Sequence, residues 1–280
     1  MKRVISYSLF GTNLFYRRAL PAILRAANVI FPGWEVRIYH NSDIGSVNYD
    51  NVLINLARKG LIKLVYIEQP AILCKAMLWR LLPIWDKDTE YVICRDIDAL
   101  LMPRERIAVE QFIESGAPAH CISDHFMHGV HMMGGTVGFN TTKFIEITKF
   151  MNFDDLLIKS GFTDDMLSIK GSDQDLLGQH VWPLIESTVC EHRTDGRPPA
   201  YAGGKSYTTI HSSNTYGMND EIIDVGNKIV PFIGIHRFDP IKAKDFYNRY
   251  CDDDFREAII CAESKFNINF DEIARCSIPD

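Results

Sequence analysis

The most informative part of this 280-residue chain reads Tyr91-Val92-Ile93-Cys94-Arg95-Asp96-Ile97-Asp98. It begins as an apolar strand and ends in two aspartates separated by one residue. Because ligands of α/β folds collect beyond the carboxyl ends of the strands, we expect Asp96 and Asp98 to face a cleft. Carboxylate oxygens are ligands for Mg²⁺ or Mn²⁺, and such an ion neutralises a diphosphate. The stretch therefore predicts a metal and diphosphate site, and the alternative is a solvated acidic turn.

Strands and helices alternate on both sides of this motif. Before it, the pattern predicts strands at 4–10, 34–39 and 61–67 and helices at 16–30, 51–58 and 74–82. After it, the pattern predicts helices at 104–114, 144–150 and 175–185, strands at 119–123 and 232–235, and a His- and Gly-rich loop over 124–138. This alternation predicts an α/β fold with a mostly parallel central sheet flanked by helices.

The composition excludes several classes of protein. With 46% hydrophobic residues, the chain can bury a sizeable core. Its net charge of -6 offers no basic field, so nucleic acid is not an expected partner. No uncharged apolar stretch reaches the ~18 residues of a membrane span. The 7 cysteines form no Cys-x-x-Cys pair, which is typical of free thiols and favours a cytoplasmic setting.

A second acidic motif reads Gly171-Ser172-Asp173-Gln174-Asp175 and lies just ahead of the predicted helix at 175–185. One interpretation is an N-cap, formed by Ser172 or Asp173. The other is that a carboxylate or amide of the motif reaches the cleft. The two interpretations are compatible, and both stay open at this point.

The loop between the two acidic motifs supplies further candidates. Asp124, His125 and His128 have no adjacent ligand that would complete a tetrahedral zinc set, so polar contact with ligand hydroxyls is the preferred interpretation. Gly134 and Gly135 permit close backbone approach to a ligand, and the alternative is a tight turn.

Two side chains outside these motifs also have the chemistry of a phosphate and metal site. His236 follows the predicted strand at 232–235, where it can complete the metal shell of the aspartates or pack as a structural histidine. Arg80 lies on the predicted helix at 74–82, and its planar fork of donors suits phosphate.

Taken together, these motifs resemble those of GT-A fold glycosyltransferases, in particular small soluble enzymes of bacteria and large DNA viruses. The matching segments cover roughly residues 4 to 180 and read Ile5-Ser6-Tyr7-Ser8-Leu9-Phe10-Gly11, Phe31-Pro32-Gly33-Trp34, Trp79-Arg80, Arg95-Asp96-Ile97-Asp98, Arg104-Glu105, Asp124-His125-x-x-His128 with Gly134-Gly135, and Asp173-Gln174. The resemblance implies one GT-A domain over 1–280, with a Rossmann-like nucleotide-binding half to about residue 100. An acceptor and metal-completing half over 101–240 and a C-terminal helical extension over 241–280 would follow.

The resemblance also implies a donor site and a metal site. The donor would be a UDP-sugar such as UDP-xylose, UDP-glucose or UDP-galactose, and the cofactor Mn²⁺ or Mg²⁺. The implied donor-binding residues are Phe10, Gly11, Arg80, Arg95 and Asp96. The implied metal ligands are Asp96, Asp98 and His236.

On the acceptor side, the resemblance implies a glycan or glycoprotein whose hydroxyl receives the sugar. The implied acceptor and sugar contacts are Asp124, His125, His128, Gly134, Gly135, Gln174 and Asp175. Asp173 is the candidate general base of an inverting transfer, in which a carboxylate deprotonates the attacking hydroxyl, and Asp175 or Asp124 is the alternative base. The setting would be the cytoplasm, or the host cytoplasm for a viral enzyme.

Three alternatives stay open. A retaining mechanism would suit the glycogenin-like family, but its His-x-x-Gly-x-x-Lys-Pro-Trp motif is absent after His236. A haloacid-dehalogenase-type phosphatase would use Asp96 as nucleophile and Asp98 as acid/base, although that motif normally follows the first strand. A non-catalytic glycan-binding module is the third, but it has no need of a strand-end metal site.

Overall fold

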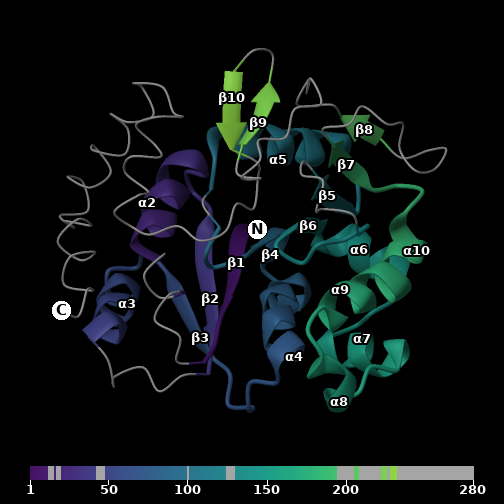
Figure 1. Ribbon diagram of the computed structural model, residues 1–280, viewed down its shortest axis with the longest axis horizontal. Coiled ribbons are helices and arrows are strands. Elements are labelled where there is room, and N and C mark those ends of the chain that lie inside the picture. The colour runs from purple at the N-terminus through teal and green to yellow at the C-terminus, as the bar shows by residue number, and fades with distance from the viewer. Residues whose placement is uncertain are drawn as a thin grey trace.

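The computed structural model describes residues 1–11, 16, 20–41, 48–99, 101–123 and 130–193, and three short strands at 205–207, 222–225 and 228–231. The strands are β1 Lys2–Leu9, β2 Glu35–His40, β3 Lys63–Tyr66, β4 Thr89–Arg95, β5 Ala119–Ser123, β6 Thr136–Asn140, β7 Cys190–Arg193, β8 Lys205–Tyr207, β9 Ile222–Val225 and β10 Lys228–Pro231. Eight of them form the central sheet, in the order β3-β2-β1-β4-β6-β5-β7-β8 (Figure 1). β9 and β10 pair separately.

Most neighbours in the central sheet are parallel. β1 pairs in parallel with β2 and β4, β2 with β3, and β7 with β5 and β8. Only β6 runs against its two neighbours, β4 and β5, among the described strands of this sheet. The predicted α/β class with a mostly parallel sheet is therefore confirmed.

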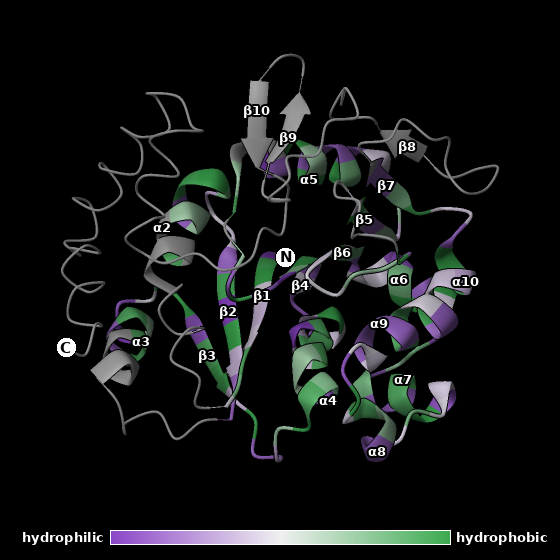
Figure 2. Ribbon diagram, in the orientation of Figure 1, coloured by the Kyte–Doolittle hydropathy of each residue, from purple (hydrophilic) through white to green (hydrophobic). Residues whose placement is uncertain are grey.

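The helices are α2 Leu20–Ile30, α3 Asn48–Arg58, α4 Leu73–Leu78, the 3₁₀ helix η1 Trp79–Trp85, α5 Pro103–Ser115, α6 Thr141–Thr148, α7 Phe153–Ser160, α8 Asp164–Leu167, α9 Ser172–Leu176, the π segment η2 Leu177–Val181 and α10 Trp182–Ile185. α4 is coloured mainly hydrophobic in Figure 2, whereas α8 has two acidic and two apolar residues. Within the described ranges, no helix has the length and apolar character of a membrane span.

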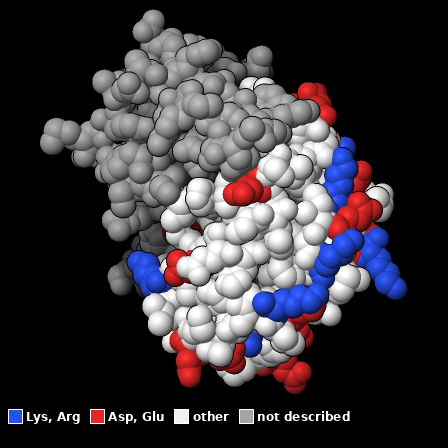
Figure 3. All heavy atoms as spheres, turned by 90° about the vertical axis from the view of Figure 1, so that its right-hand side faces the viewer, with Lys and Arg blue, Asp and Glu red and all other residues white. Residues whose placement is uncertain are grey.

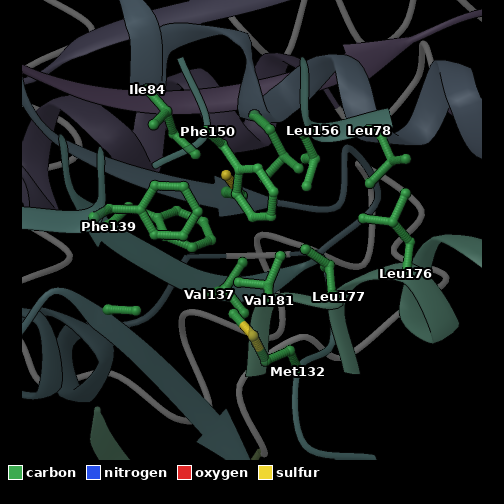
Figure 4. Close-up of a cluster of buried hydrophobic side chains, with 14 of the residues drawn as sticks. Leu78, Ile84, Met132, Val137, Phe139, Phe150, Leu156, Leu176, Leu177 and Val181 are labelled. Atoms are coloured by element: carbon green, nitrogen blue, oxygen red, sulfur yellow. The ribbon is translucent and has the colours of Figure 1, made fainter. Parts of the chain in front are cut away.

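The two faces of the sheet carry separate hydrophobic cores, because successive side chains of a strand point to opposite faces. Ile93 of β4 belongs to the core that includes residues of α2 and α3, together with Val109 of α5. Val92 and Cys94 belong to the second core, which α4, η1, α6, α7, α9 and α10 complete. Figure 4 shows side chains of β6, η1 and the 172–185 helical region converging in this second core.

Three details of the sequence-based prediction are wrong. The loop predicted over 124–138 is shorter at its end, because residues 136–140 form the buried strand β6. The predicted helix at 74–82 is two segments, α4 and η1. The predicted helix at 175–185 starts earlier, at Ser172.

The predicted N-cap is also wrong in its residue. Gly171 is the N-cap of α9 and makes no side-chain cap bond, and its φ of 94° is a left-handed conformation that suits glycine. Ser172 and Asp173 are therefore the first helical residues. The predicted strand at 232–235 and the helical extension at 241–280 lie outside the described residues.

Candidate active site

A cleft of about 650 Å³ opens where β1 and β4 end. One wall is the end of β1, from Ser8 to Phe10, and the residues after β4, from Asp96 to Asp98, lie beside it. Further lining residues come from α4, η1, the segment before β6, and α9 with the residue before its N-cap: they are Leu73, Met77, Arg80, Met133, Gly134, Gly135, Lys170, Asp173 and Gln174. The cleft thus lies at the carboxyl ends of parallel strands, where α/β folds bind ligands.

The two aspartates after β4 reach the cleft because of where the strand ends. β4 pairs with β1 up to Cys94 and with β6 up to Arg95. The chain then turns, and the amide of Ala99 donates to the carbonyl of Asp96 at 3.0 Å. Asp96 and Asp98 both line the cleft, and the Asp96 side chain is 22% exposed.

Arg80 forms the charged floor of this cleft. It is 3% exposed, and its Nη1 is paired with Asp96 Oδ1. Its Nη2 lies 3.5 Å from Oδ2 of Asp173. Burial alone would lower the pKa of Arg80, but the charges of Asp96 and Asp173 raise it above the ordinary value. Arg80 is therefore a fixed cation that joins the two acidic motifs.

The backbone around Arg80 is held to β1 and β4. The amide of Arg80 donates to Ser8 Oγ at 3.0 Å, and this hydroxyl donates to the carbonyl of Met77 at 3.1 Å. The thiol of Cys94 donates to the carbonyl of Arg80 at 3.3 Å. These contacts fix the position from which Arg80 reaches both carboxylates.

Asp173 is a buried carboxylate with unused acceptor capacity. The residue is 1% exposed, and its carboxylate oxygens make at most weak contacts with described residues: Arg80 Nη2 at 3.5 Å, the Cys74 thiol and the Gln174 amide. Burial raises the pKa of Asp173, and the charge of Arg80 partly offsets that rise. A buried acceptor without a strong hydrogen bond is costly, so a ligand that donates to it from the cleft is favoured.

The glycine pair leaves room for these two charged side chains. A Cβ on Gly134 would lie 3.1 Å from Cζ of Arg80 and closer still to its Nη2. A Cβ on Gly135 would overlap the carboxylate of Asp96. We expected close backbone approach to a ligand, and the structure shows close approach to the side chains of the site itself.

The structure brings most of the predicted site residues to this cleft. Those that line it are Phe10, Arg80, Asp96, Asp98, Gly134, Gly135, Asp173 and Gln174. Gly11 follows Phe10 directly, with a φ of 72°. Asp175 is exposed on α9 and is not among the lining residues. The predicted sites Asp124, His125, His128 and His236 lie outside the described residues.

Arg95 does not reach the cleft. Its side chain is 1% exposed and pairs with Glu105 of α5, while Nη1 donates to the carbonyl of Val137 at 2.9 Å. Arg95 is the last residue of β4 and its side chain pairs with α5, whereas Asp96 follows the end of the strand and lines the cleft. We therefore remove Arg95 from the candidate donor site.

Asp96 and Asp98 are the described residues suited to hold a metal ion. No group of three or more His, Cys, Asp or Glu side chains could hold a metal ion within the described ranges. Mg²⁺ nevertheless needs only one or two carboxylates when substrate phosphates and water complete its shell. The pair of carboxylates beside an open cleft fits that mode of binding.

Two cleft residues had no signal in the sequence. Tyr16 lines the cleft, and burial together with the charges of Asp98 and Asp96 raises its pKa. Lys170 also lines the cleft and lies just before the N-cap glycine of α9. Each became visible only when the fold brought its segment to the aspartates.

Comparison with known proteins gives likenesses of fold. No protein-family model matches the chain, and no curated protein matches it. The glycosyltransferase GlyE of Streptococcus pneumoniae is 11% identical, with a TM-score of 0.46 over 68% of this chain and 45% of its own. The galactosyltransferase LgtC, solved with donor and acceptor sugar analogues, is 14% identical, with a TM-score of 0.42 over 68% of this chain and 73% of its own. The 4-diphosphocytidyl-2C-methyl-D-erythritol synthase of Anaerococcus prevotii is 13% identical, with a TM-score of 0.40 over 59% of this chain and 80% of its own.

Proposed function

We propose that this chain is a metal-dependent glycosyltransferase, which moves a sugar from a nucleoside diphosphate, here UDP, to a hydroxyl of a glycan or glycoprotein. The observation that carries the proposal is the meeting of two acidic motifs in one cleft, where Arg80 joins Asp96 to Asp173. The resemblance of the motifs to GT-A enzymes supports the same class.

In this proposal the donor lies along the carboxyl ends of β1 and β4. Phe10 and Gly11 would contact the nucleotide, and Asp96 and Asp98 would hold Mn²⁺ or Mg²⁺ together with diphosphate oxygens. When bound, the ion neutralises the charge that develops on the leaving diphosphate. His236 is proposed as a further metal ligand, and the Asp124–His128 segment as part of the acceptor side.

Asp173 is proposed as the general base of an inverting transfer. The acceptor oxygen attacks the anomeric carbon, the bond from that carbon to the diphosphate oxygen breaks, and the acceptor proton passes to Asp173. The raised pKa of this carboxylate makes it a stronger base than an exposed aspartate. Its oxygens, which make at most weak contacts with described residues, can accept the hydroxyl proton.

The cytoplasm is the proposed place of action. Three of the described cysteines, Cys74, Cys94 and Cys121, are buried free thiols. Free thiols persist where the surroundings are reducing, and this chemistry supports the proposal.

The strand order disfavours the phosphatase alternative. The phosphatase motif normally follows the first strand, whereas β4 is the fourth described strand of the chain. Incubation with a generic phosphate ester checks this point, because a transferase leaves the ester intact.

Calorimetry of UDP binding tests the proposed function. Wild-type protein should bind UDP in the presence of Mn²⁺ and lose that binding when the metal is chelated. Asp98→Ala should lose most of the metal-dependent affinity. Asp88→Ala is the matched control, because Asp88 is an exposed carboxylate that pairs with Lys2 at 2.8 Å and is not part of the cleft. Equal UDP affinity in folded Asp98→Ala and wild type would refute the metal assignment.

The role of Asp173 needs a separate measurement. Asp173→Asn should keep donor affinity and lose a factor of ~10² to 10⁴ in turnover, the usual effect of removing a general base. Proton NMR of the product gives the anomeric outcome directly. An α-linked product from an α-linked donor would exclude both the inverting mechanism and Asp173 as its base.

A further inference from the structure

The charged residues that line the cleft differ in whether a neighbouring residue already neutralises them. Three carboxylates line it, those of Asp96, Asp98 and Asp173, and the two described cations are Arg80 and Lys170. Arg80 is buried and lies against both Asp96 and Asp173. The positive charge of Arg80 is therefore largely neutralised by these two carboxylates, and its interaction with a ligand would be weak.

Lys170 is placed differently. It is exposed on the turn between α8 and α9, and within the described ranges its ammonium group makes no ion pair. The turn itself is anchored, because the thiol of Cys74 donates to the carbonyl of Ile169 at 3.0 Å. An anchored backbone thus holds Lys170 among the residues that line the cleft together with Asp96 and Asp98.

We propose that Lys170 binds the diphosphate of the donor and stabilises it as a leaving group. This inference rests on the proposed function. A divalent ion shared with Asp96 and Asp98 neutralises only part of a diphosphate, and Arg80 is already compensated. Lys170 is then the cation among the described lining residues that can meet the remaining phosphate charge.

The role of Lys170 in the reaction is electrostatic. As the bond between the anomeric carbon and the diphosphate oxygen breaks, the electron pair stays on that oxygen. The ammonium group donates a hydrogen bond to a phosphate oxygen and keeps its proton throughout. Fixed donors of this kind act where charge develops in the transition state.

UDP binding in the presence of Mn²⁺ tests the inference without reference to turnover. Lys170→Met should weaken UDP about tenfold, the scale of one charge-assisted hydrogen bond at a partly exposed site. It should also make the affinity less sensitive to added salt, because one charge contact is gone. Lys170→Arg should keep both properties, since it restores the cation. An exposed lysine can be replaced without loss of the fold.

Lys75→Met is the matched control. Lys75 is on α4 near the same turn, but its Nζ pairs with Asp164 at 2.7 Å and it does not line the cleft. This variant should bind UDP as wild type does. Donor hydrolysis without acceptor gives a second readout, in which Lys170→Met should lower the rate and Lys75→Met should not.

The possible failures are distinguishable. If wild type binds neither UDP nor inorganic pyrophosphate with Mn²⁺, the proposed function fails and the inference falls with it. If wild type binds UDP and Lys170→Met binds it equally well with the same salt dependence, the inference about Lys170 is overturned while the proposed function stands. Equal weakening by Lys75→Met would overturn it as well, because the effect would then be one of general surface charge.

Discussion

Two buried arginine clusters lie on either side of the end of β4, and they differ in whether a ligand can reach them. Arg80 pairs with Asp96, whose side chain is 22% exposed to the cleft. Arg95 pairs with Glu105, and both of these side chains are 1% exposed. The first cluster is open on one side, and the second is closed.

The difference follows from where β4 ends. Arg95 is its last residue and is buried against α5, whereas Asp96 lies just beyond the strand end and lines the cleft. Arg95 donates to the carbonyls of Cys94 at 2.7 Å and Val137 at 2.9 Å, so it connects β4, β6 and α5. The closed cluster therefore supports the fold behind the cleft, whereas the open cluster leaves carboxylates at the cleft. In this chain one charged motif at a strand end thus contains both a cleft residue and a buried supporting residue.

The face that carries α9 and α10 is different again. Figure 3 shows it with blue and red side chains interspersed along its edges and a large described area without charged groups. No broad basic patch lies on the described part of this face. The charge that matters for the proposed ligand is concentrated in the cleft.

The largest expected effect comes from opening the closed cluster. Glu105→Ala leaves the guanidinium of Arg95 buried without its carboxylate, which should lower the free energy of unfolding by about 3–5 kcal/mol. Urea denaturation measures the loss. Glu110→Ala is the control on the same helix, since Arg106 and Glu110 form an exposed pair at 2.7 Å that contributes about 0.5 kcal/mol or less. If the two variants lose the same free energy of unfolding, the buried pair of Arg95 and Glu105 stabilises the fold no more than the exposed pair does.

The open cluster should respond to a matching change by a smaller amount that depends on pH. Arg80→Met should cost about 2 kcal/mol at neutral pH, less than a closed pair, because Asp96 keeps contact with water. The folded-state pKa of Asp173 is raised by burial, and loss of Arg80 raises it further. The folded state then takes up a proton before the unfolded state does, so the cost should shrink as pH falls.

Denaturation of Arg80→Met at pH 7.5 and pH 5.5 checks the sign. Glu105→Ala should show no such relief, because the arginine that it strands cannot release its proton. If the loss of unfolding free energy in Arg80→Met stays constant or grows on acidification, Asp173 does not take up a proton in the folded variant, and the assignment is wrong.

A third change perturbs the open cluster without removing a charge. Gly135→Ala places a methyl group against the carboxylate of Asp96. It should cost about 1–2 kcal/mol in stability, as overpacking does. It should also weaken metal-dependent UDP binding, because the carboxylate must move. Gly178→Ala is the control, since a Cβ there meets no atom within 4 Å, and calorimetry should show unchanged binding.

The first half of the fold could be predicted from the sequence because its signals are local. Each strand from β1 to β4 is a short segment with β-branched and aromatic residues, and the Asp-x-Asp motif follows the last of them. β6 was missed because its residues, Thr136–Asn140, include Gly138 and follow two glycines, a pattern that is typical of a loop.

The site was predictable in its residue types and not in its pairings. Strand-end carboxylates and a downstream acidic motif are visible in the sequence, and both line the cleft. Contacts between distant segments of the chain decide which arginine forms an ion pair with which carboxylate. Arg95 looks the better candidate beside Asp96, yet Arg80, one helix earlier, is the arginine that Asp96 meets.

The smallest expected effect concerns the closed side, where the charge of Arg95 reaches His120. His120 is fully buried, and its Nε2 lies 2.7 Å from Nδ1 of His192, whose Nε2 lies 2.9 Å from Oε1 of Gln111. Burial, and then the charges of His192 and Arg95, hold the pKa of His120 well below its usual range. His120 is therefore neutral in the folded protein and takes up a proton in the unfolded chain near pH 6.5.

The unfolded state binds more protons below that pH, so stability should fall on acidification by at most about 1.4 kcal/mol per pH unit for this group. Urea denaturation at pH 7.5, 6.5 and 5.5 should show a shallower decline for His120→Gln than for wild type, whatever the offset between them. Parallel declines of the two proteins would mean that His120 does not stay neutral in the folded state.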